Sequence, residues 1–426
     1  MSQNDNRGLV TRFASAQLQE FTEAFRVVIV NGPRQAGKTT LLHEHQRHRG
    51  GEYRTLDLPA VRRVAETDPA TFAQPSETPL IIDEVQLGGD RLVRTIKQIV
   101  DSNRQPGQFI LSGSTRFLTT PGISESLAGR AVFIDLWPLS MAERSAGQVP
   151  HLIQRALAEP RSLIGHHSRW TRDAYLEAIC TGGYPEAIRL RSDRLRGSWY
   201  SSYVQTIISR DIDAFASIRD VRLLERLLGL IAARSAGLLV YSDLARELDV
   251  SIPTAQTYLA HLDTVFLTAT VPAWSTNATS RLTKSPKVFL TDTGLLAQQL
   301  GATPVSLRRP GAPALGGLVE SFVLTELLKS DAVAEDVRLS HFRDRDGREI
   351  DFICEGRDGR IVAIEVKASL SPRADADRHL RWLRGKLGDR FAAGIVFYLG
   401  EQGFSMGDDI YLLPISSLWN HGMVRT

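Results

Sequence analysis

The stretch RVVIVNGPRQAGKTT, residues 26–40, joins a short apolar run to a glycine-rich turn and then to a segment with helical spacing. Residues 32–39 fit the pattern G-x-x-x-x-G-K-[S/T] at every fixed position. The backbone N–H groups of such a loop wrap around phosphate oxygens, and the N-terminus of the following helix adds partial positive charge. The pattern therefore predicts a nucleoside triphosphate site; the alternative is an ordinary strand-turn-helix with chance glycines.

The side chains that end this loop have separate expected roles. Lys38 is expected to contact the outer phosphates, and the Thr39 hydroxyl is expected to bind Mg²⁺. ATP and Mg²⁺ are therefore the predicted cofactors. The predicted nucleotide-binding residues are Gly32, Pro33, Arg34, Gln35, Ala36, Gly37, Lys38, Thr39 and Thr40.

A second signal is the segment PLIIDE, residues 79–84, in which an apolar strand ends in two acids. At the carboxyl edge of a parallel sheet, Asp83 would hold Mg²⁺ through water and Glu84 would polarise the attacking water. An apolar run followed by Asp-Glu is common and mostly structural when it stands alone. Its place after a complete phosphate loop favours the catalytic interpretation.

Two further features concern the γ-phosphate. Residues 108–111 are predicted to form a strand that ends in Ser112-Gly113-Ser114-Thr115. A polar side chain there would orient water, or the segment is a polar turn, and the pattern favours neither. Arg130 and Arg116 are candidate arginine fingers, and a finger supplied in trans would require an oligomer.

At this point the ordered motifs resemble a known family. They are GPRQAGKTT (32–40), LIIDEVQ (80–86), SGSTRF (112–117), SLAGR (126–130), WPLS (137–140) and GGYP (182–185). This set resembles the AAA-type ATPases, and more narrowly the bacterial and archaeal ATP-binding proteins with a C-terminal domain of unknown function. The resemblance covers nearly the whole chain. It implies a RecA-like core of the additional-strand, catalytic-glutamate type, which gives Glu84 its role by analogy.

Composition bounds the class of protein. Hydrophobic residues are 42% and charged residues 23% of the 426 residues, as in ordinary soluble globular proteins. The formal charge of +3 is too small to identify a nucleic-acid partner. Cys180 and Cys354 lack metal-ligand spacing, which argues for a reducing compartment. Because no apolar run approaches the roughly 20 residues of a membrane span, we expect a cytoplasmic location and no membrane partner.

We expect four parts in the chain. They are an AAA-type ATPase domain at residues 1–148, a helical lid at 149–235, a winged-helix module at 236–305 and a restriction-endonuclease-like domain at 306–426. The lid is rich in arginine, interleaved with acids. This pattern is compatible with a phosphate-backbone stripe, and the interleaving favours an ion-paired, solvated lid.

The winged-helix interpretation depends on a helix over 241–248, a turn, and a helix over 252–265 with Ser251 as N-cap and Pro253 in its first turn. Strands over 266–271 and 287–290 follow. The candidate DNA contacts are Thr254, Gln256, Thr257, His261, Arg281 and Lys284. The second helix carries no arginine or lysine, so a module used for packing or oligomer contact is an equal alternative.

The C-terminal region contains a predicted β-hairpin, residues 348–354 and 361–367. Glu365 and Lys367 are two residues apart in the second strand, so their side chains face the same way, and Asp351 can join that face. With Glu320 from the preceding helix, these residues would bind one or two Mg²⁺ and activate water against a phosphodiester. The order resembles the restriction-endonuclease-like nucleases, whose D…E-x-K set matches Asp351, Glu365 and Lys367.

Two alternatives remain for that region. It is a charged hairpin on a structural domain, or it keeps the nuclease-like fold for binding alone. The expected fold is thus multidomain α/β, with a RecA-like P-loop AAA-type core and a restriction-endonuclease-like α/β C-terminal domain.

The expected function is Mg²⁺-dependent ATP hydrolysis coupled to action on nucleic acid, with DNA favoured over RNA and a homo-oligomer possible. The alternatives are a metal-dependent nuclease or toxin-like effector regulated by ATP, and a non-enzymatic nucleotide switch that binds protein partners.

Overall fold

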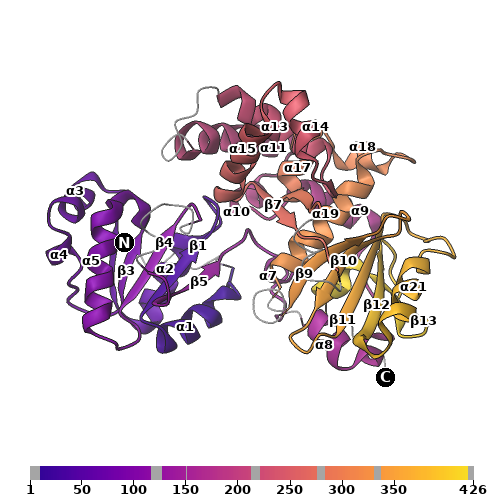
Figure 1. The fold of residues 1–426 in the computed structure, drawn as a ribbon, viewed down its shortest axis with the longest axis horizontal. Coiled ribbons are helices and arrows are strands. Elements are labelled where there is room, and N and C mark those ends of the chain that lie inside the picture. Colours follow the sequence, from indigo (N-terminus) through magenta and orange to yellow (C-terminus); the bar gives the residue numbers. More distant parts are fainter. Residues whose placement is uncertain are drawn as a thin grey trace.

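The computed structural model describes residues 10–116, 127–149, 151–212, 221–275, 284–330 and 337–420. Figure 1 shows a parallel sheet with its helices at one end of the molecule and a second sheet at the other. A mostly helical region lies between and above them. The two sheets belong to the N-terminal and C-terminal parts of the chain.

The N-terminal sheet has the order β2-β3-β4-β1-β5, and every neighbouring pair is parallel. Its strands are β1 (Val27–Asn31), β2 (Glu52–Thr55), β3 (Leu80–Asp83), β4 (Phe109–Gly113) and β5 (Ala131–Asp135). Strand β4 separates β1 from β3, which confirms the additional strand that the resemblance implied. The carboxyl ends of β1 and β3 therefore lie at the same edge of the sheet.

Helices cover both faces of this sheet because its central strands are apolar on both sides. One face packs against α1 (Ala14–Ala24) and α2 (Lys38–Arg49) through Leu18, Leu41 and Leu42. The other face packs against α3 (Pro59–Thr67), α4 (Pro69–Phe72) and α5 (Gly89–Ser102).

The middle of the chain is mainly helical. Its helices are α7 (Met141–Arg144), α8 (Leu152–Ala158), α9 (Arg172–Thr181), α10 (Pro185–Arg189), α11 (Asp193–Thr206), α13 (Val221–Ala233), α14 (Tyr241–Leu248) and α15 (Ile252–Thr264). A π-helical turn, Ile207–Ile212, extends α11. Ser251 caps α15 by accepting a hydrogen bond from the N–H of Thr254, as predicted. A small antiparallel sheet, β6-β8-β7, contains β6 (Gly237–Leu238), β7 (Thr268–Val271) and β8 (Lys287–Leu290).

The C-terminal sheet has the order β13-β14-β12-β11-β10-β9. The predicted hairpin is confirmed as β10 (Glu349–Glu355) paired antiparallel with β11 (Ile361–Lys367). The other strands are β9 (Arg338–Arg343), β12 (Phe391–Tyr398), β13 (Phe404–Gly407) and β14 (Ile410–Pro414). Helices α19 (Leu315–Leu328) and α21 (Arg378–Leu387) pack against this sheet. Helices α17 (Thr293–Gln299) and α18 (Pro304–Arg308) lie with the middle helices (Figure 1).

The middle helices and the C-terminal sheet share one hydrophobic core, which runs in sequence from Met141 to Trp419. In that core the Tyr175 hydroxyl accepts a hydrogen bond of 2.9 Å from the N–H of Ser416. The N-terminal sheet has two cores of its own. The four-part division stays a prediction, and the packing joins residues from its last three parts.

None of the helices in the described ranges combines the length and the apolar run that a membrane crossing requires. Both cysteines, Cys180 and Cys354, are buried and unoxidised. Burial raises the pKa of each thiol to about 12, so neither is a ready thiolate at neutral pH.

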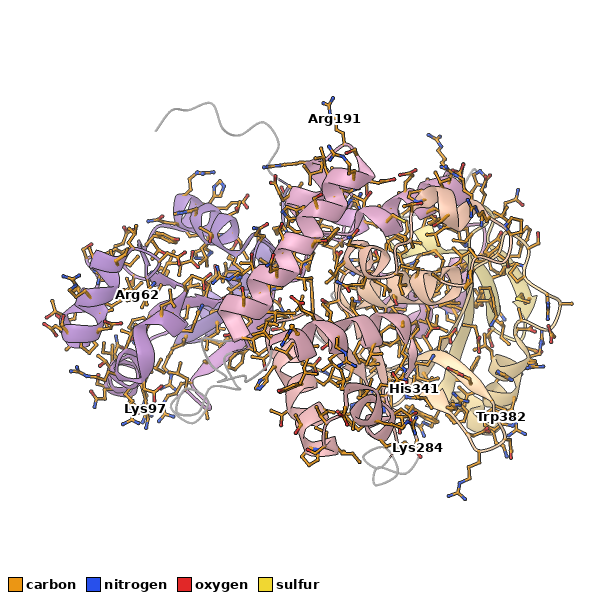
Figure 2. The ribbon with its side chains drawn as sticks, turned by 90° about the horizontal axis from the view of Figure 1, so that it is seen from above. Arg62, Lys97, Arg191, Lys284, His341 and Trp382 are labelled. Atoms are coloured by element: carbon orange, nitrogen blue, oxygen red, sulfur yellow. The ribbon has the colours of Figure 1, made fainter. Side chains whose placement is uncertain are left out.

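His341 of β9 lies where the small sheet meets the C-terminal sheet. Its backbone N–H donates to Pro272 and its carbonyl accepts from Trp274, at 2.9 and 2.6 Å. Its Nε2 lies 3.1 Å from the carbonyl oxygen of Ser285. Figure 2 shows His341 beside Lys284 at this junction. A backbone bridge and a buried imidazole thus join the two sheets.

This imidazole should make stability depend on pH. Burial, helped by repulsion from Lys287 and Lys284, lowers the pKa of His341 to about 4, against the opposing Ser285 carbonyl and Glu349. The unfolded chain therefore binds more protons between pH 6.5 and 4, and stability should fall as pH falls through that window, by up to about 3 kcal/mol. Urea unfolding at pH 7.5 and 5 should show about 2 kcal/mol of this change in the free energy of unfolding.

The matched variants are His341→Gln, which removes the titrating group, and His151→Gln at an exposed position. The first should flatten the pH dependence and the second should leave it unchanged. An undiminished slope in His341→Gln would contradict the assignment.

Candidate functional site

The loop between β1 and α2 follows a path that requires glycine at two positions. A Cβ at Gly32 would lie 2.3 Å from the carbonyl oxygen of Leu136, so no other residue fits beside this backbone. Gly37, the residue before α2, has φ +99°, and Gln35 also has a positive φ of 61°. The fixed glycines of the sequence pattern therefore have a steric reason in this chain.

Lys38 is buried at the start of α2, and its ammonium lies inside the curve of the loop. Its Nζ donates hydrogen bonds to the carbonyl oxygens of Gly32 and Pro33, at 2.9 and 3.0 Å. This places a positive charge at the N-terminus of α2, the position predicted for contact with the outer phosphates.

Asp83 lies at the carboxyl end of β3 and is the centre of a polar cluster. Its Oδ2 accepts hydrogen bonds from the hydroxyls of Thr39 and Tyr53, at 2.7 and 2.8 Å. Its Oδ1 is in contact with Ser112 Oγ and accepts from the N–H of Glu84 at 3.1 Å. Burial and the Asp83 carboxylate raise the pKa of the Tyr53 phenol, so the hydroxyl stays a donor.

These oxygens fit the predicted magnesium ion. A threonine hydroxyl and a carboxylate are hard oxygen ligands, and they already lie next to each other at the end of the phosphate loop. Ser112 was predicted only as one of several strand-tip residues, and Tyr53 was not predicted at all. Both contacts arise from strands that pair in the sheet, β2 with β3 and β3 with β4.

Glu84 follows Asp83 in a left-handed backbone conformation with φ 55°. Its carboxylate is in contact with the side-chain amide of Gln86, which also donates to Ser114 Oγ at 3.2 Å. Gln86 therefore connects the strand-tip serine to the predicted catalytic glutamate. Both interpretations of the tip, a water-orienting group and a polar turn, are compatible with this contact.

A cleft of about 860 Å³ separates the phosphate loop from α10 and α11. It is lined by Arg34, Gln35, Gly37, Lys38, Thr39, Thr40 and Glu84 on one side and by Pro185, Glu186, Arg189, Trp199, Ser202, Tyr203, Thr206 and Ile207 on the other. The Tyr203 hydroxyl donates a 3.3 Å hydrogen bond to the Arg34 carbonyl oxygen. The middle helices thus form one wall of the predicted nucleotide site.

The arginines of the middle region have different surroundings. Arg189 lines the cleft and lies 3.9 Å from Glu186, and Arg196 is paired with Asp193. Arg191 is exposed and points away from the molecule (Figure 2). These pairs agree with the ion-paired lid, and Arg189 also lines the cleft, a position that the arginine pattern did not predict.

Neither candidate arginine finger lines the cleft. Arg130 Nε lies 2.5 Å from Asp101 Oδ1 of α5, at the surface. Arg116 lies over the Phe266 ring at 4.5 Å and 3.4 Å from Asp135. In cis these two arginines therefore serve other contacts, and a role of Arg130 in a neighbouring subunit stays a prediction.

Arg12 is a buried residue that no motif indicated. Its guanidinium donates to the carbonyl oxygens of Ala36 in the loop and Trp137 after β5, both at 2.7 Å. Its Nε pairs with Glu143 of α7 at 2.9 Å. The N–H of Met141, at the start of α7, in turn donates to Glu326 of α19 at 2.8 Å. A chain of buried contacts thus connects the phosphate loop to the C-terminal part.

The predicted C-terminal residues come together. Lys367 Nζ lies 2.7 Å from Glu365 Oε2, which confirms that the two side chains share a face of β11. Asp351 Oδ2 accepts a hydrogen bond of 2.8 Å from the N–H of Val366. Glu320 of α19 lies beside Asp351. Burial raises the pKa of Glu320, and the Asp351 carboxylate raises it further. We refer to Glu320, Glu349, Asp351 and Glu365 as the acid cluster.

A lysine that was not predicted fills the acid cluster. Lys287 of β8 is 1% exposed, and its Nζ lies 2.7 Å from Glu320, 2.8 Å from Glu349 and 3.3 Å from Asp351. Burial and the Asp351 charge raise the pKa of Glu320 and of Glu365 to about 8. Within the described residues, no three His, Cys, Asp or Glu side chains are grouped so that they could hold a metal ion. With Lys287 in place, the acid cluster does not fit a divalent cation.

The candidate DNA contacts of α15 lie partly at the surface. Gln256 and Thr257 are exposed, whereas Thr254 Oγ1 is 2.8 Å from Ser251 Oγ and His261 is half-buried. Lys284 Nζ donates to the carbonyl oxygen of Arg343 at 3.4 Å. Arg281 lies outside the described residues. The contacts themselves stay predictions.

Three family models match the chain. Residues 24–145 match a model described as AAA domain. This match supports a P-loop ATPase core in that segment. Residues 172–306 and 315–418 match two domains of unknown function, DUF8612 and DUF4143. The AAA-matched segment contains the phosphate loop, Asp83 and Glu84, and all four residues of the acid cluster lie in the DUF4143 segment.

Two bacterial proteins are similar to most of this chain, and a solved archaeal structure matches part of it. An uncharacterized protein of Mycobacterium tuberculosis is 28% identical over 97% of this chain and 85% of its own length. One of Haemophilus influenzae is 23% identical over 82% of this chain and 84% of its own. A solved Walker-type ATPase of Pyrococcus abyssi is 14% identical, covers 68% of this chain and 96% of its own, and has a TM-score of 0.41.

Proposed function

We propose that this protein is a Mg²⁺-dependent ATPase. The observation that carries the proposal is the hydrogen bond between Thr39 and Asp83, which unites the phosphate loop and the strand acid at one sheet edge. The loop, residues 32–40, would bind the phosphates, and Lys38 would neutralise charge on the outer two. Thr39 and, through water, Asp83 would hold the metal, which would supply charge stabilisation. Glu84 would orient and polarise the attacking water.

The oligomer forms part of this proposal. Arg130 is at the surface of the core, so it can serve as a finger only at the site of a neighbouring subunit. We propose a homo-oligomer on that basis, in the cytoplasm.

We further propose that hydrolysis is coupled to action on nucleic acid, DNA in preference to RNA. The winged-helix interpretation of residues 236–305 supports this through the exposed Gln256 and Thr257 on α15. The buried contacts of Arg12 with Ala36 and Glu143, and of Met141 with Glu326, supply a physical link toward the C-terminal part.

A second candidate is a metal-dependent nuclease of restriction-endonuclease-like fold, regulated by ATP. The grouping of Asp351, Glu365 and Lys367 on one face of the hairpin favours it. No reaction step is assigned to this site, because Lys287 holds its carboxylates.

One sample, assayed for ATP hydrolysis and for cleavage of single- and double-stranded DNA and RNA, separates these functions. We expect Mg²⁺-dependent ATP hydrolysis that DNA alters in rate. Cleavage that is lost in Asp351→Ala while hydrolysis survives would favour the second candidate. The exposed Asp389→Ala, from the same domain, is the matched control. Failure to retain DNA or RNA at modest salt, with no cleavage, would overturn the nucleic-acid part of the proposal.

A further inference from the structure

We propose that Lys287 is the resident cation of the acid cluster and excludes divalent metal ions from Glu320 and Asp351. The inference rests on the proposed function only in naming a divalent cation as the competitor. Its test measures metal binding. The proposal for Lys287 can therefore fail while ATP hydrolysis is found, and it can hold while no ATP hydrolysis is found.

The contacts of Lys287 are those of a bound ion. Its side chain is fully enclosed, and its ammonium has a carboxylate oxygen within 3.3 Å on each of three sides, from Glu320, Glu349 and Asp351. An ammonium has three N–H donors and no acceptor, so three acids satisfy it completely. An enclosed lysine without such partners would be costly, because burial penalises its charge.

A divalent ion requires the same oxygens. Mg²⁺ binds carboxylates at about 2.0–2.1 Å in a near-octahedral arrangement, which places it among the oxygens that Lys287 contacts. The two cations would then lie within a few ångströms of each other in a buried site, where like charges repel strongly. Occupation by one therefore excludes the other.

The acid cluster retains the composition of a metal site once Lys287 is removed. It holds four acidic side chains, those of Glu320, Glu349, Asp351 and Glu365, and one remaining ammonium, that of Lys367. Glu365 Oε1 is buried and has no hydrogen-bond partner. His379 Nδ1 is 3.9 Å from that oxygen and also 2.8 Å from the Glu349 carbonyl oxygen. Removal of one positive charge should therefore leave a site that binds a divalent cation.

Lys287 belongs to a different sheet from the one that carries most of the acid cluster. Lys287 begins β8, which pairs with β6 and β7 in the small sheet, whereas Glu349, Asp351 and Glu365 belong to the C-terminal sheet. Metal affinity of the acid cluster is thereby tied to the position of β8. The ion pairs of Lys287 with Glu349 and Asp351 also join the small sheet to the C-terminal sheet.

The test is Mn²⁺ binding by the full-length chain without nucleotide, measured by the loss of the free-ion electron paramagnetic resonance signal. Lys287→Met removes the charge and keeps most of the side-chain length. It should gain a Mn²⁺ site at least about tenfold tighter than any in the wild type. Lys386→Met, at an exposed lysine of α21, should behave as the wild type. The double variant Lys287→Met/Asp351→Asn should lose the gained site, because it lacks the Asp351 carboxylate. The phosphate loop is unchanged in this variant, so the loss cannot arise there.

Two outcomes would overturn the proposal. In one, the wild type already holds a Mn²⁺ ion that Asp351→Asn removes. In the other, Lys287→Met gains no Asp351-dependent site. If Lys287→Met folds poorly, thermal melting decides: Mn²⁺ should raise its midpoint more than that of the wild type or of Lys287→Met/Asp351→Asn. An equal rise in all three would overturn the proposal as well.

Discussion

Lys38→Ala should weaken ATP binding by about 100-fold or more, because each charge-assisted hydrogen bond to phosphate contributes up to about 3 kcal/mol. The Lys38 ammonium is buried inside the loop and held by the carbonyl oxygens of Gly32 and Pro33. Alanine removes the only lysine of the loop and leaves unchanged the two glycines, Gly32 and Gly37, that its path requires. Titration with a fluorescent ATP analogue, or calorimetry, measures the change.

Lys97→Ala is the matched control for this variant. Lys97 belongs to α5 of the same core and does not line the cleft, and Figure 2 shows it at the surface. Its replacement should leave ATP affinity unchanged. Equal affinities of Lys38→Ala and the wild type would show that the nucleotide binds elsewhere or does not bind.

Glu84→Gln should lower the rate of ATP hydrolysis by about 10²- to 10⁴-fold while ATP affinity changes little. The substitution keeps the size of the side chain and its contact with Gln86, and it removes only the charge that polarises water. Steady-state phosphate release and an equilibrium binding assay on the same sample separate the two effects.

The control is Glu66→Gln, at an exposed position on α3 of the same core. It should hydrolyse ATP at the wild-type rate. A Glu84→Gln variant that loses binding and hydrolysis in equal measure would assign Glu84 to nucleotide binding. One that keeps full hydrolysis would remove it from the reaction.

The residues that pattern alone located are those whose neighbours are close in sequence. Gly32, Gly37, Lys38 and Thr39 belong to one turn and helix start, where backbone sterics and the helix N-terminus determine which residues fit. In β10 and β11 the two-residue period placed Glu365 and Lys367 on one face, and the structure agrees. Local geometry is enough for such groups.

Other residues needed the tertiary structure because their partners are far away along the chain. Arg12 and Glu143 are 131 positions apart, and no repeat or spacing connects them. Tyr203 meets Arg34 only because α11 packs over the phosphate loop. The contact of Arg130 with Asp101 likewise depends on how α5 packs, and the contacts of Arg116 depend on the positions of Asp135 and Phe266.

The sequence by itself therefore determined that a nucleotide loop, a strand acid pair and a D…E-x-K hairpin exist, since short-range sterics and strand period encode each of them. Only the tertiary structure decided what surrounds these groups. Lys287 is 64 positions from Asp351, and strand pairing brings it into the acid cluster. Burial and charge then act on groups that the chain order keeps apart, so the state of that cluster depends on the packing of two sheets.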